Sequence, residues 1–321
     1  MARGDSSTTS RRTFVQSGTL AALAAWLQSR SRGGLLAQQV NDAELMRAAG
    51  TSARISVNPL RRTVKVLMGS GGNILVLPGP DGKVLVDSGY ATSQPQISTA
   101  LGIVSNNPIR HLVDTHWHFD HTDGNEWIHA TGAAITAHMN TRKRLSALQQ
   151  IPAFHGRFPP APDGALPTNT FEVRTSLHLN NEEILLEYYG PAHSDSDISV
   201  RLVRADILHT GDTWFNGCYP FIDYYNGGSL QGMLAASDRN LRAVDNQTLI
   251  VPGHGSAGKK AQLVEYDEML RVMEERISTL KKQGRSVEET IAAKPSASFD
   301  GKWGHGLVQP DAFVELMYAG V

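Results

Sequence analysis

The amino-acid sequence predicts a layered α/β sandwich. Short apolar strands separated by glycine-rich turns come first, as expected for hairpins. Further on, strands alternate with segments whose apolar residues recur at helical spacing. Such a succession is typical of sheets covered by helices. No repeat of roughly 20–50 residues is evident, which argues against a solenoid or a propeller.

The elements are expected in the following order. A short helix over residues 42–49 leads to a break at Pro59. Strands are expected at residues 64–68, 73–77, 83–86, 109–115, 184–188, 198–203, 207–210 and 248–251. Helices are expected at residues 97–104, 230–244 and 259–283. Residues 150–168 are rich in Pro and Gly and are expected to form a loop or lid.

The composition is that of a globular chain with a sizeable core. The chain has 321 residues, of which 40% are hydrophobic. A chain of this length buries roughly three quarters of its unfolded surface, so it needs no disulfide scaffold. The single cysteine, Cys218, excludes an internal disulfide and a cysteine-rich zinc knuckle. The longest apolar run, residues 19–27, is about half of what a bilayer crossing requires, so no membrane span is expected.

Charge is distributed unevenly along the chain. Residues 1–37 carry five arginines and one aspartate, whereas the remaining residues carry 25 basic and 30 acidic side chains. A mildly acidic body argues against a nucleic-acid surface, because such a surface neutralises phosphates with clustered Lys and Arg. We therefore expect a small-molecule substrate and no nucleic-acid partner.

The N-terminal residues resemble a twin-arginine export signal. Ser10, Arg11, Arg12 and Phe14 match the S-R-R-x-F pattern, and the short apolar run follows them. The alternative is a disordered basic tail followed by an ordinary helix. Export would place the mature protein in the bacterial periplasm or outside the cell.

This resemblance divides the chain into three parts. Residues 1–37 are the expected signal peptide, with cleavage near Ala37. Residues 38–60 form an N-terminal segment, and residues 61–321 form the main domain.

Histidine and aspartate concentrate at five places, each at the end of an expected strand or in the turn after it. In an extended segment side chains alternate, so His116 and His118 point to one side and can share a metal ion. The turn that follows brings Asp120 and His121 round to a neighbouring position. Imidazole nitrogen and carboxylate oxygen are ligand types that Zn²⁺ prefers. The alternative is a solvated polar loop. The five motifs are Val86-Asp87-Ser88-Gly89, residues 115–121, Pro191-Ala192-His193-Ser194, Thr210-Gly211-Asp212-Thr213 and Pro252-Gly253-His254-Gly255.

Taken in this order, the five motifs resemble those of the metallo-β-lactamase-fold superfamily of metallohydrolases. They include His116-x-His118-x-Asp120-His121, and the resemblance covers roughly residues 61–260. The resemblance implies an αββα four-layer sandwich. It also implies two metal ions. His116, His118 and His193 would hold the first, Asp120, His121 and His254 would hold the second, and Asp212 would bridge them. Asp87, at the first motif of the family, would support these ligands without being one.

The resemblance further implies a reaction. Two cations roughly 3.5–4 Å apart lower the pKa of a bridging water to near 7, and the resulting hydroxide attacks a carbonyl or phosphoryl centre. Asp120 would orient this nucleophile or carry its proton. We expect two zinc ions per chain, although iron or manganese suits the same ligand types. The Gly-Asp-Thr around Asp212 is closer to the hydroxyacylglutathione hydrolase branch than to the cysteine-bearing β-lactamases.

The predicted function is therefore that of an exported dinuclear-metal hydrolase that cleaves an ester, lactone, amide, β-lactam or related bond. Two alternatives remain open at this point. The same ligands can hold iron in a redox enzyme of this fold. The protein can also be a periplasmic binder of a metal or ligand without turnover.

The aromatic side chains after Asp212 are expected either to line the rim of a pocket or to pack in the core. His138 is a candidate for a hydrogen bond to the metal ligands. Cys218 is expected to be a buried or loop thiol. The aromatic residues are Trp214, Phe215, Tyr219, Tyr224 and Tyr225. The other histidines, expected to be structural or at the surface, are His111, His129, His155, His178, His209 and His305.

Overall fold

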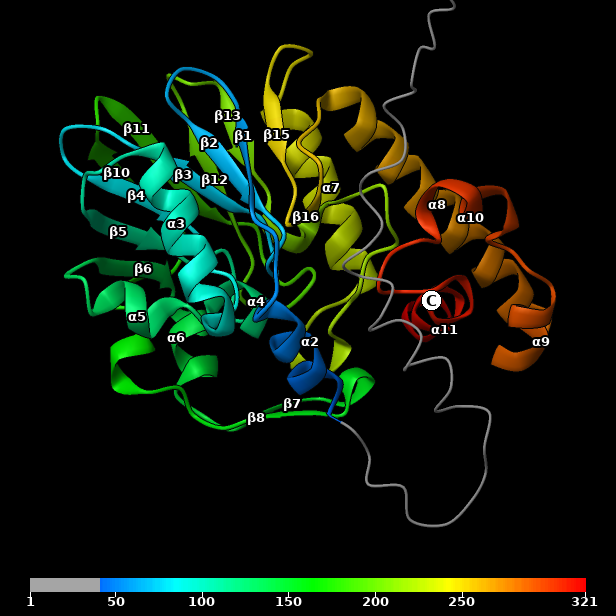
Figure 1. Ribbon diagram of the computed structural model, residues 1–321. Coiled ribbons are helices and arrows are strands. Elements are labelled where there is room, and N and C mark those ends of the chain that lie inside the picture. The colour runs from blue at the N-terminus through cyan, green and yellow to red at the C-terminus, as the bar shows by residue number, and fades with distance from the viewer. Residues whose placement is uncertain (1–40) are drawn as a thin grey trace, which may run out of the picture.

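The structure is a computed structural model that describes residues 41–321, and Figure 1 shows the chain as a ribbon. Two β-sheets face each other, and helices cover their outer sides. The predicted signal peptide, residues 1–37, lies outside the described residues. No helix within residues 41–321 combines the length and the apolar character needed to cross a membrane.

The larger sheet contains seven strands in the order β1-β2-β3-β4-β5-β6-β9. Its first four strands form an antiparallel meander, and the last three run parallel to β4. The strands are β1 (Ser56–Pro59), β2 (Lys65–Met68), β3 (Ile74–Leu77), β4 (Lys83–Val86), β5 (Ile109–Val113), β6 (Ala134–His138) and β9 (Asn169–Phe171). The helices between them are α3 (Gln94–Val104), α4 (Phe119–Thr122), α5 (Asn125–His129) and α6 (Met139–Leu145).

The smaller sheet contains five strands in the order β10-β11-β12-β13-β15. Its first four strands are antiparallel, and β15 runs parallel to β13. Helix α7 connects β13 to β15 and lies on the outer face of the sheet. The elements are β10 (Arg174–Leu179), β11 (Glu182–Tyr188), β12 (Ile198–Leu202), β13 (Ile207–His209), α7 (Leu230–Ala243) and β15 (Leu249–Val251).

Three apolar cores define the layers. One lies between the two sheets, where Val86 of β4 belongs to the same buried cluster as Val200 of β12. A second lies between the larger sheet and α3, with Leu112 and Ile97 as members. The third lies outside the smaller sheet, where Leu208 packs with the helices. The order helix, sheet, sheet, helix confirms the predicted αββα sandwich.

The C-terminal helices extend the outer helical layer, in orange and red in Figure 1. Helix α8 (Lys260–Lys282) packs on α7, and α11 (Pro310–Gly320) contacts α8, α9 and α7. The short helices α9 (Val287–Ala292) and α10 (Ala297–Trp303) lie between them in sequence. The sequence had predicted α7 and α8 with bounds that differ by one residue at most, but it had not predicted the helices after residue 283.

Residues 150–168 are more regular than the predicted loop, because they contain most of the hairpin β7 (Gln149–Ile151) and β8 (Gly156–Phe158). Helix α2 (Asp42–Gly50) forms as predicted and packs near β8. Arg47 of α2 donates two hydrogen bonds to Asp123, directly after α4, with N–O distances of 2.5 and 2.8 Å. The N-terminal segment is thereby joined to the turn that follows the HxHxDH motif.

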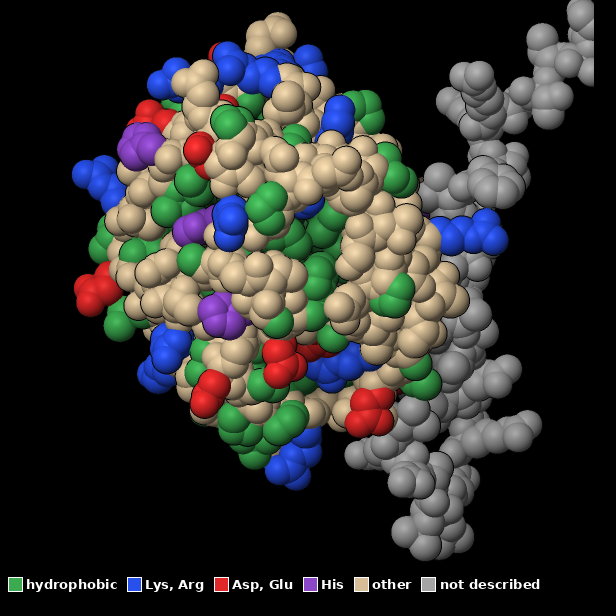
Figure 2. All heavy atoms as spheres, turned by 60° about the vertical axis from the view of Figure 1, so that its left-hand side comes forward, with side chains coloured by type: hydrophobic (Ala, Val, Ile, Leu, Met, Phe, Trp, Pro, Cys, Tyr) green, Lys and Arg blue, Asp and Glu red, His purple; other side chains and the backbone are tan. Residues whose placement is uncertain are grey.

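Basic, acidic and hydrophobic side chains are interspersed over the face of the molecule shown in Figure 2. The view turns the left-hand side of Figure 1 forward.

Candidate metal centre

The five motifs meet at one edge of the sandwich because each follows a strand that ends there. Asp87 follows β4, and residues 116–121 follow β5 and enter α4. These two strands are parallel, so their carboxyl ends lie at the same edge. The same holds for β13 and β15, which precede Asp212 and His254. His193 lies in the connection from β11 to β12.

The structure brings all seven predicted ligand residues together in two clusters. The first cluster contains His116, His118, His193 and Asp212, and the second contains Asp120, His121 and His254. Within each cluster, one potential ligand atom from every residue lies within 4.8 Å of the others. Each cluster thus offers enough nitrogen and oxygen atoms to hold one cation.

Asp212 lies between the two clusters. One of its carboxylate oxygens, Oδ2, is 3.4 Å from Nε2 of His193 and 3.4 Å from Nε2 of His254. The other, Oδ1, is 3.2 Å from Nε2 of His121. Its carboxylate therefore approaches histidines of both clusters. Gly253 also lies against this carboxylate, and a Cβ at that position would overlap Oδ1.

Hydrogen bonds on the far side of three imidazole rings fix how the rings are turned. His118 contacts Oδ2 of Asp223 through Nε2 at 2.9 Å, and His121 contacts Oδ2 of Asp87 through Nδ1 at 2.7 Å. Nδ1 of His193 lies 2.8 Å from the carbonyl oxygen of Phe221. A ring nitrogen that donates to such a partner leaves the other nitrogen unprotonated, as a metal ligand requires.

The environment of His116 indicates that the clusters suit a cation. Its side chain is fully buried, and Nδ1 lies 3.1 Å from the hydroxyl of Thr115. Its Nε2 faces the clusters without a hydrogen-bond partner. An unsatisfied buried polar atom costs about 1–3 kcal/mol, so it calls for a partner that the protein itself does not supply. Five histidines and two aspartates form a donor set that suits divalent metals such as zinc.

The charges within the clusters compensate one another. Burial alone would lower the pKa of His254, but the carboxylates of Asp212 and Asp120 raise it to about 9. Burial would raise the pKa of Asp120, but His121 and His254 lower it to about 2. Burial lowers the pKa of His193 to about 4. The carboxylates and imidazoles of the second cluster thus stabilise each other's charged forms.

Asp87 plays the supporting part that the resemblance implies. Its carboxylate accepts hydrogen bonds from the backbone N–H and the hydroxyl of Thr115, and it also contacts His121. Its backbone has a φ of 66°, in the left-handed region that is costly for a residue with a side chain. In this position Asp87 links Thr115, directly before the first histidine of the motif, to His121 of the second cluster.

Asp223 is a site residue that sequence reasoning missed. It is buried and orients His118, and its own Oδ2 also accepts a hydrogen bond from the side-chain amide of Asn226 at 2.7 Å. It lies 105 residues after His118, among aromatic residues that drew attention only as a pocket rim. The sequence signal for Asp223 was that it is a carboxylate in the segment that follows the Asp212 motif.

The aromatic residues after Asp212 mostly pack in the core. The hydroxyl of Tyr219 donates to Asp300, and the hydroxyl of Tyr224 donates to the carbonyl of Leu316. Tyr225 is exposed. Only Phe215, in the short strand β14 (Phe215–Asn216), stacks on a site residue, with its ring 5.3 Å from that of His254 in β16 (His254–Gly255).

The remaining candidates lie apart from the clusters. His138 contacts the carbonyl of Glu172 and stacks on Tyr188. His305 is exposed and contacts the carbonyl of Gly301. Cys218 is partly buried, and burial raises the pKa of its thiol to about 12. None of these three residues hydrogen-bonds to a member of the clusters within the described part of the chain.

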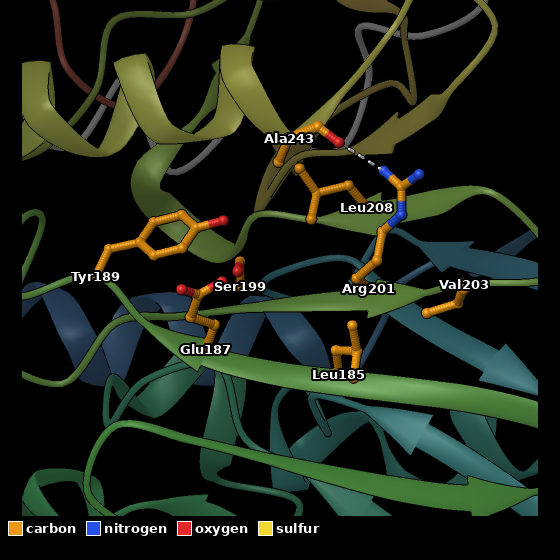
Figure 3. Close-up of a pocket in the computed structure, with 8 residues that line it drawn as sticks. All are labelled: Leu185, Glu187, Tyr189, Ser199, Arg201, Val203, Leu208 and Ala243. Atoms are coloured by element: carbon orange, nitrogen blue, oxygen red, sulfur yellow. Dashed lines mark hydrogen bonds between the residues drawn. The ribbon is translucent and has the colours of Figure 1, made fainter.

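A separate groove lies on the outer side of the smaller sheet, next to the end of α7 (Figure 3). Its volume is about 300 Å³, and it contains no member of the clusters. Arg201 donates a hydrogen bond across it to the carbonyl of Ala243 at 3.1 Å.

Two sheets face each other, and two clusters rich in His and Asp lie together at one edge of them. This arrangement is typical of dinuclear metallohydrolases. The family model described as "Metallo-beta-lactamase superfamily" matches residues 67–254, which is more than half of the chain. The chain belongs to the metallo-β-lactamase superfamily.

Solved structures agree with this fold. A metallo-β-lactamase from Pontibacter korlensis superimposes with a TM-score of 0.55 and 19% identity, over 68% of this chain and 99% of that protein. The DIM-1 metallo-β-lactamase gives a TM-score of 0.53 and 18% identity, over 68% and 97% of the two chains. At these identities the likeness concerns the fold alone.

Two curated relatives are hydroxyacylglutathione hydrolases. The one from Polaromonas sp. (strain JS666) is 27% identical over 148 residues, and the one from Rhodospirillum rubrum is 30% identical over 148 residues. In both cases the match covers 46% of this chain and 48% of the relative. The matched part thus spans about half the length of these curated relatives.

Proposed function

We propose that the protein is an exported hydrolase that uses two zinc ions to cleave an ester, thioester, lactone, amide or β-lactam bond. The observation that carries the proposal is the convergence of seven His and Asp side chains in two clusters, with Asp212 in contact with both. A single cation would occupy one cluster and leave the ligand atoms of the other without a metal ion. Membership of the superfamily supports the same reading.

The first cluster would hold one zinc ion through His116, His118 and His193, and the second cluster would hold the other through Asp120, His121 and His254. Asp212 would bridge them. When bound, such a pair of cations supplies a Lewis acid for the substrate oxygen and activates water at neutral pH. His118 and His121 donate hydrogen bonds to Asp223 and Asp87, and these bonds hold the two imidazoles in the tautomer that binding needs.

Substrate would approach from the side of the second cluster. The side chains of His254 and Asp120 are 28% and 16% exposed, whereas that of Asp212 is 4% exposed and that of His193 is 1% exposed. Asp120 is therefore the carboxylate that can exchange a proton with incoming water or with a leaving group. This position suits the role of general base or proton carrier that we assign to it.

A thioester or ester comes first among the substrates to test, because the two curated relatives are named hydroxyacylglutathione hydrolases. Each match covers 48% of the relative, so the other bond types are tested beside thioesters and esters. A panel should therefore include thioesters, simple esters, lactones and a chromogenic β-lactam.

The proposal is tested by elemental mass spectrometry of the purified protein followed by that substrate panel. We expect about two zinc ions per chain and turnover of at least one substrate class. His118→Ala should lose turnover and metal while the fold is kept, whereas His178→Ala, at an exposed histidine of β10, should retain both. Iron in place of zinc would favour the redox alternative. A metal-loaded protein that turns over none of the substrates would favour a binder.

Export is proposed from the Ser10 to Phe14 pattern and the apolar run after it. Replacing Arg11 and Arg12 by Lys should retain the protein in the cytoplasm of a bacterial host, because the paired arginines are the address that the export system reads. Fractionation followed by immunodetection measures this. Equal periplasmic amounts of the two proteins would contradict twin-arginine export.

A further inference from the structure

The turn between β2 and β3, residues 69–73, contacts two members of the second cluster although it contributes no member itself. The backbone N–H of Gly72 donates a hydrogen bond to the carbonyl of Asp120 at 3.0 Å. Gly72 also lies directly against the ring of His121, and a Cβ at this position would overlap that ring. The close approach therefore requires glycine.

Asn73, the last residue of this turn, secures the loop of His254, the third member. Its side-chain amide donates hydrogen bonds to the carbonyl oxygens of Pro252 and Gly255, at 2.9 and 2.8 Å. Its backbone N–H donates to the carbonyl of Gly253 at 2.8 Å. These three bonds bracket His254 on both sides. Asn73 itself is 4% exposed, so water cannot replace the bonds cheaply.

Asn73 is in turn fixed from the smaller sheet. Its carbonyl oxygen lies 3.2 Å from Nε2 of His209, and Nδ1 of the same histidine accepts a hydrogen bond from the N–H of Gly211. A residue of the turn between β2 and β3 thus connects the loops that carry His254 and Asp212. Each of these loops follows a strand of the smaller sheet.

The three histidines of the first cluster are supported differently. His118 is oriented by Asp223, His193 by the carbonyl of Phe221, and His116 by Thr115. Among the described residues, no hydrogen bond joins the turn to any of these histidines. The supports of the two clusters are therefore separable by mutation.

We propose that Asn73 is a positioning residue that specifically assembles the second metal-binding cluster by holding His254 against Asp120 and His121. The inference rests on the proposed function, because it concerns the second of the two proposed metal sites. Without the amide of Asn73, the loop of residues 252–255 loses two bonds to buried carbonyls, and His254 loses its fixed place.

The test is a titration of the metal-free full-length protein with Co²⁺, whose visible absorption reports the ligand set. Asn73→Asp keeps the shape of the side chain but removes the two N–H donors. Asn180→Asp is the matched control, since Asn180 also donates through its amide to two carbonyls, those of Leu77 and Gly82, away from the clusters. The apo proteins are compared by thermal unfolding.

We expect wild type and Asn180→Asp to bind two Co²⁺ per chain. Asn73→Asp should bind one ion with unchanged affinity and the other about 10- to 100-fold more weakly, the range typical for loss of a group that orients a ligand. Asn73→Ala removes the donors without adding a charge and carries the test if Asn73→Asp does not fold.

Two outcomes contradict the inference in distinguishable ways. Two ions bound by the Asn73 variants with wild-type affinities, or an equal weakening of both ions, would overturn the role of Asn73 alone. A wild-type chain that binds fewer than two ions would overturn the proposed dinuclear centre, and the role of Asn73 with it.

Discussion

Asp223 shows how a single carboxylate outside a ligand set decides which nitrogen of a ring is free. It contacts Nε2 of His118, so that Nδ1 faces His193 at 2.8 Å inside the first cluster. The negative charge also strengthens the imidazole as a donor to a cation. Its place is secured in turn by Asn226.

Asp223→Asn should therefore weaken binding of one zinc ion about 10- to 100-fold, since the neutral amide holds the ring less firmly. Competition with a chromophoric chelator measures the affinity. Asp238→Asn is the control, because Asp238 pairs with Arg271 at the surface. An unchanged zinc affinity in Asp223→Asn would show that the ring is held by packing alone.

At the residue scale, the clustering of the seven His and Asp residues and the support from Asp87 could be predicted, but the supports from Asp223 and Asn73 could not. His116, His118, Asp120 and His121 fall within six residues, and the others occur in short motifs after strands. These residues can therefore be recognised from their spacing in the sequence. Asp223 and Asn73 act on partners 105 and about 180 residues away. Such contacts exist only once both sheets are packed.

At the scale of elements, the C-terminal helices support the segment that follows Asp212. The ring of Tyr219 stacks on Phe313 of α11 at 4.1 Å, and its hydroxyl bonds to Asp300 of α10. Tyr224 bonds to the backbone of α11. The same segment contains Asp223 and the carbonyl of Phe221, which orient two histidines of the first cluster. These helices thus pack against the segment that orients two histidines of the first cluster.

Phe313→Ala should lower the free energy of unfolding by about 3–5 kcal/mol, because it empties a fully buried aromatic position. Urea denaturation followed by circular dichroism measures the change. Leu307→Ala, at a residue that is 50% exposed, is the control and should change stability by less than about 0.5 kcal/mol. A loss below about 1 kcal/mol for Phe313→Ala would mean that α11 packs only loosely on this segment.

Two of the strands that the sequence did not predict, β10 and β1, lie at the edges of their sheets. Strand β10 alternates exposed and half-buried residues at the edge of its sheet, so it lacks an apolar run. Strand β1 contains Pro59 and lies at the edge of the larger sheet. Strands β3, β4 and β12, by contrast, are almost wholly buried and read as apolar runs. Burial on both faces made these strands recognisable.

At the scale of the whole molecule, the centre joins the two halves of the sandwich. His116, His118, Asp120 and His121 follow a strand of the larger sheet, whereas His193, Asp212 and His254 follow strands of the smaller one. A cation held by both sets would favour the packed arrangement of the sheets over the unfolded chain, in which the ligands are far apart. Metal binding should therefore stabilise the entire fold.

Removing metal should lower the unfolding temperature by about 10 °C for each ion removed. A cation at about a thousand times its dissociation constant contributes about 4 kcal/mol, and each kcal/mol corresponds to about 2–4 °C in a domain of this size class. Calorimetry of chelator-treated and zinc-reconstituted protein measures the shift. His118→Ala, which lacks one ligand, should gain less from zinc than wild type. Equal unfolding temperatures with and without zinc would mean that the sheets pack without help from the centre, and that the cations serve chemistry alone.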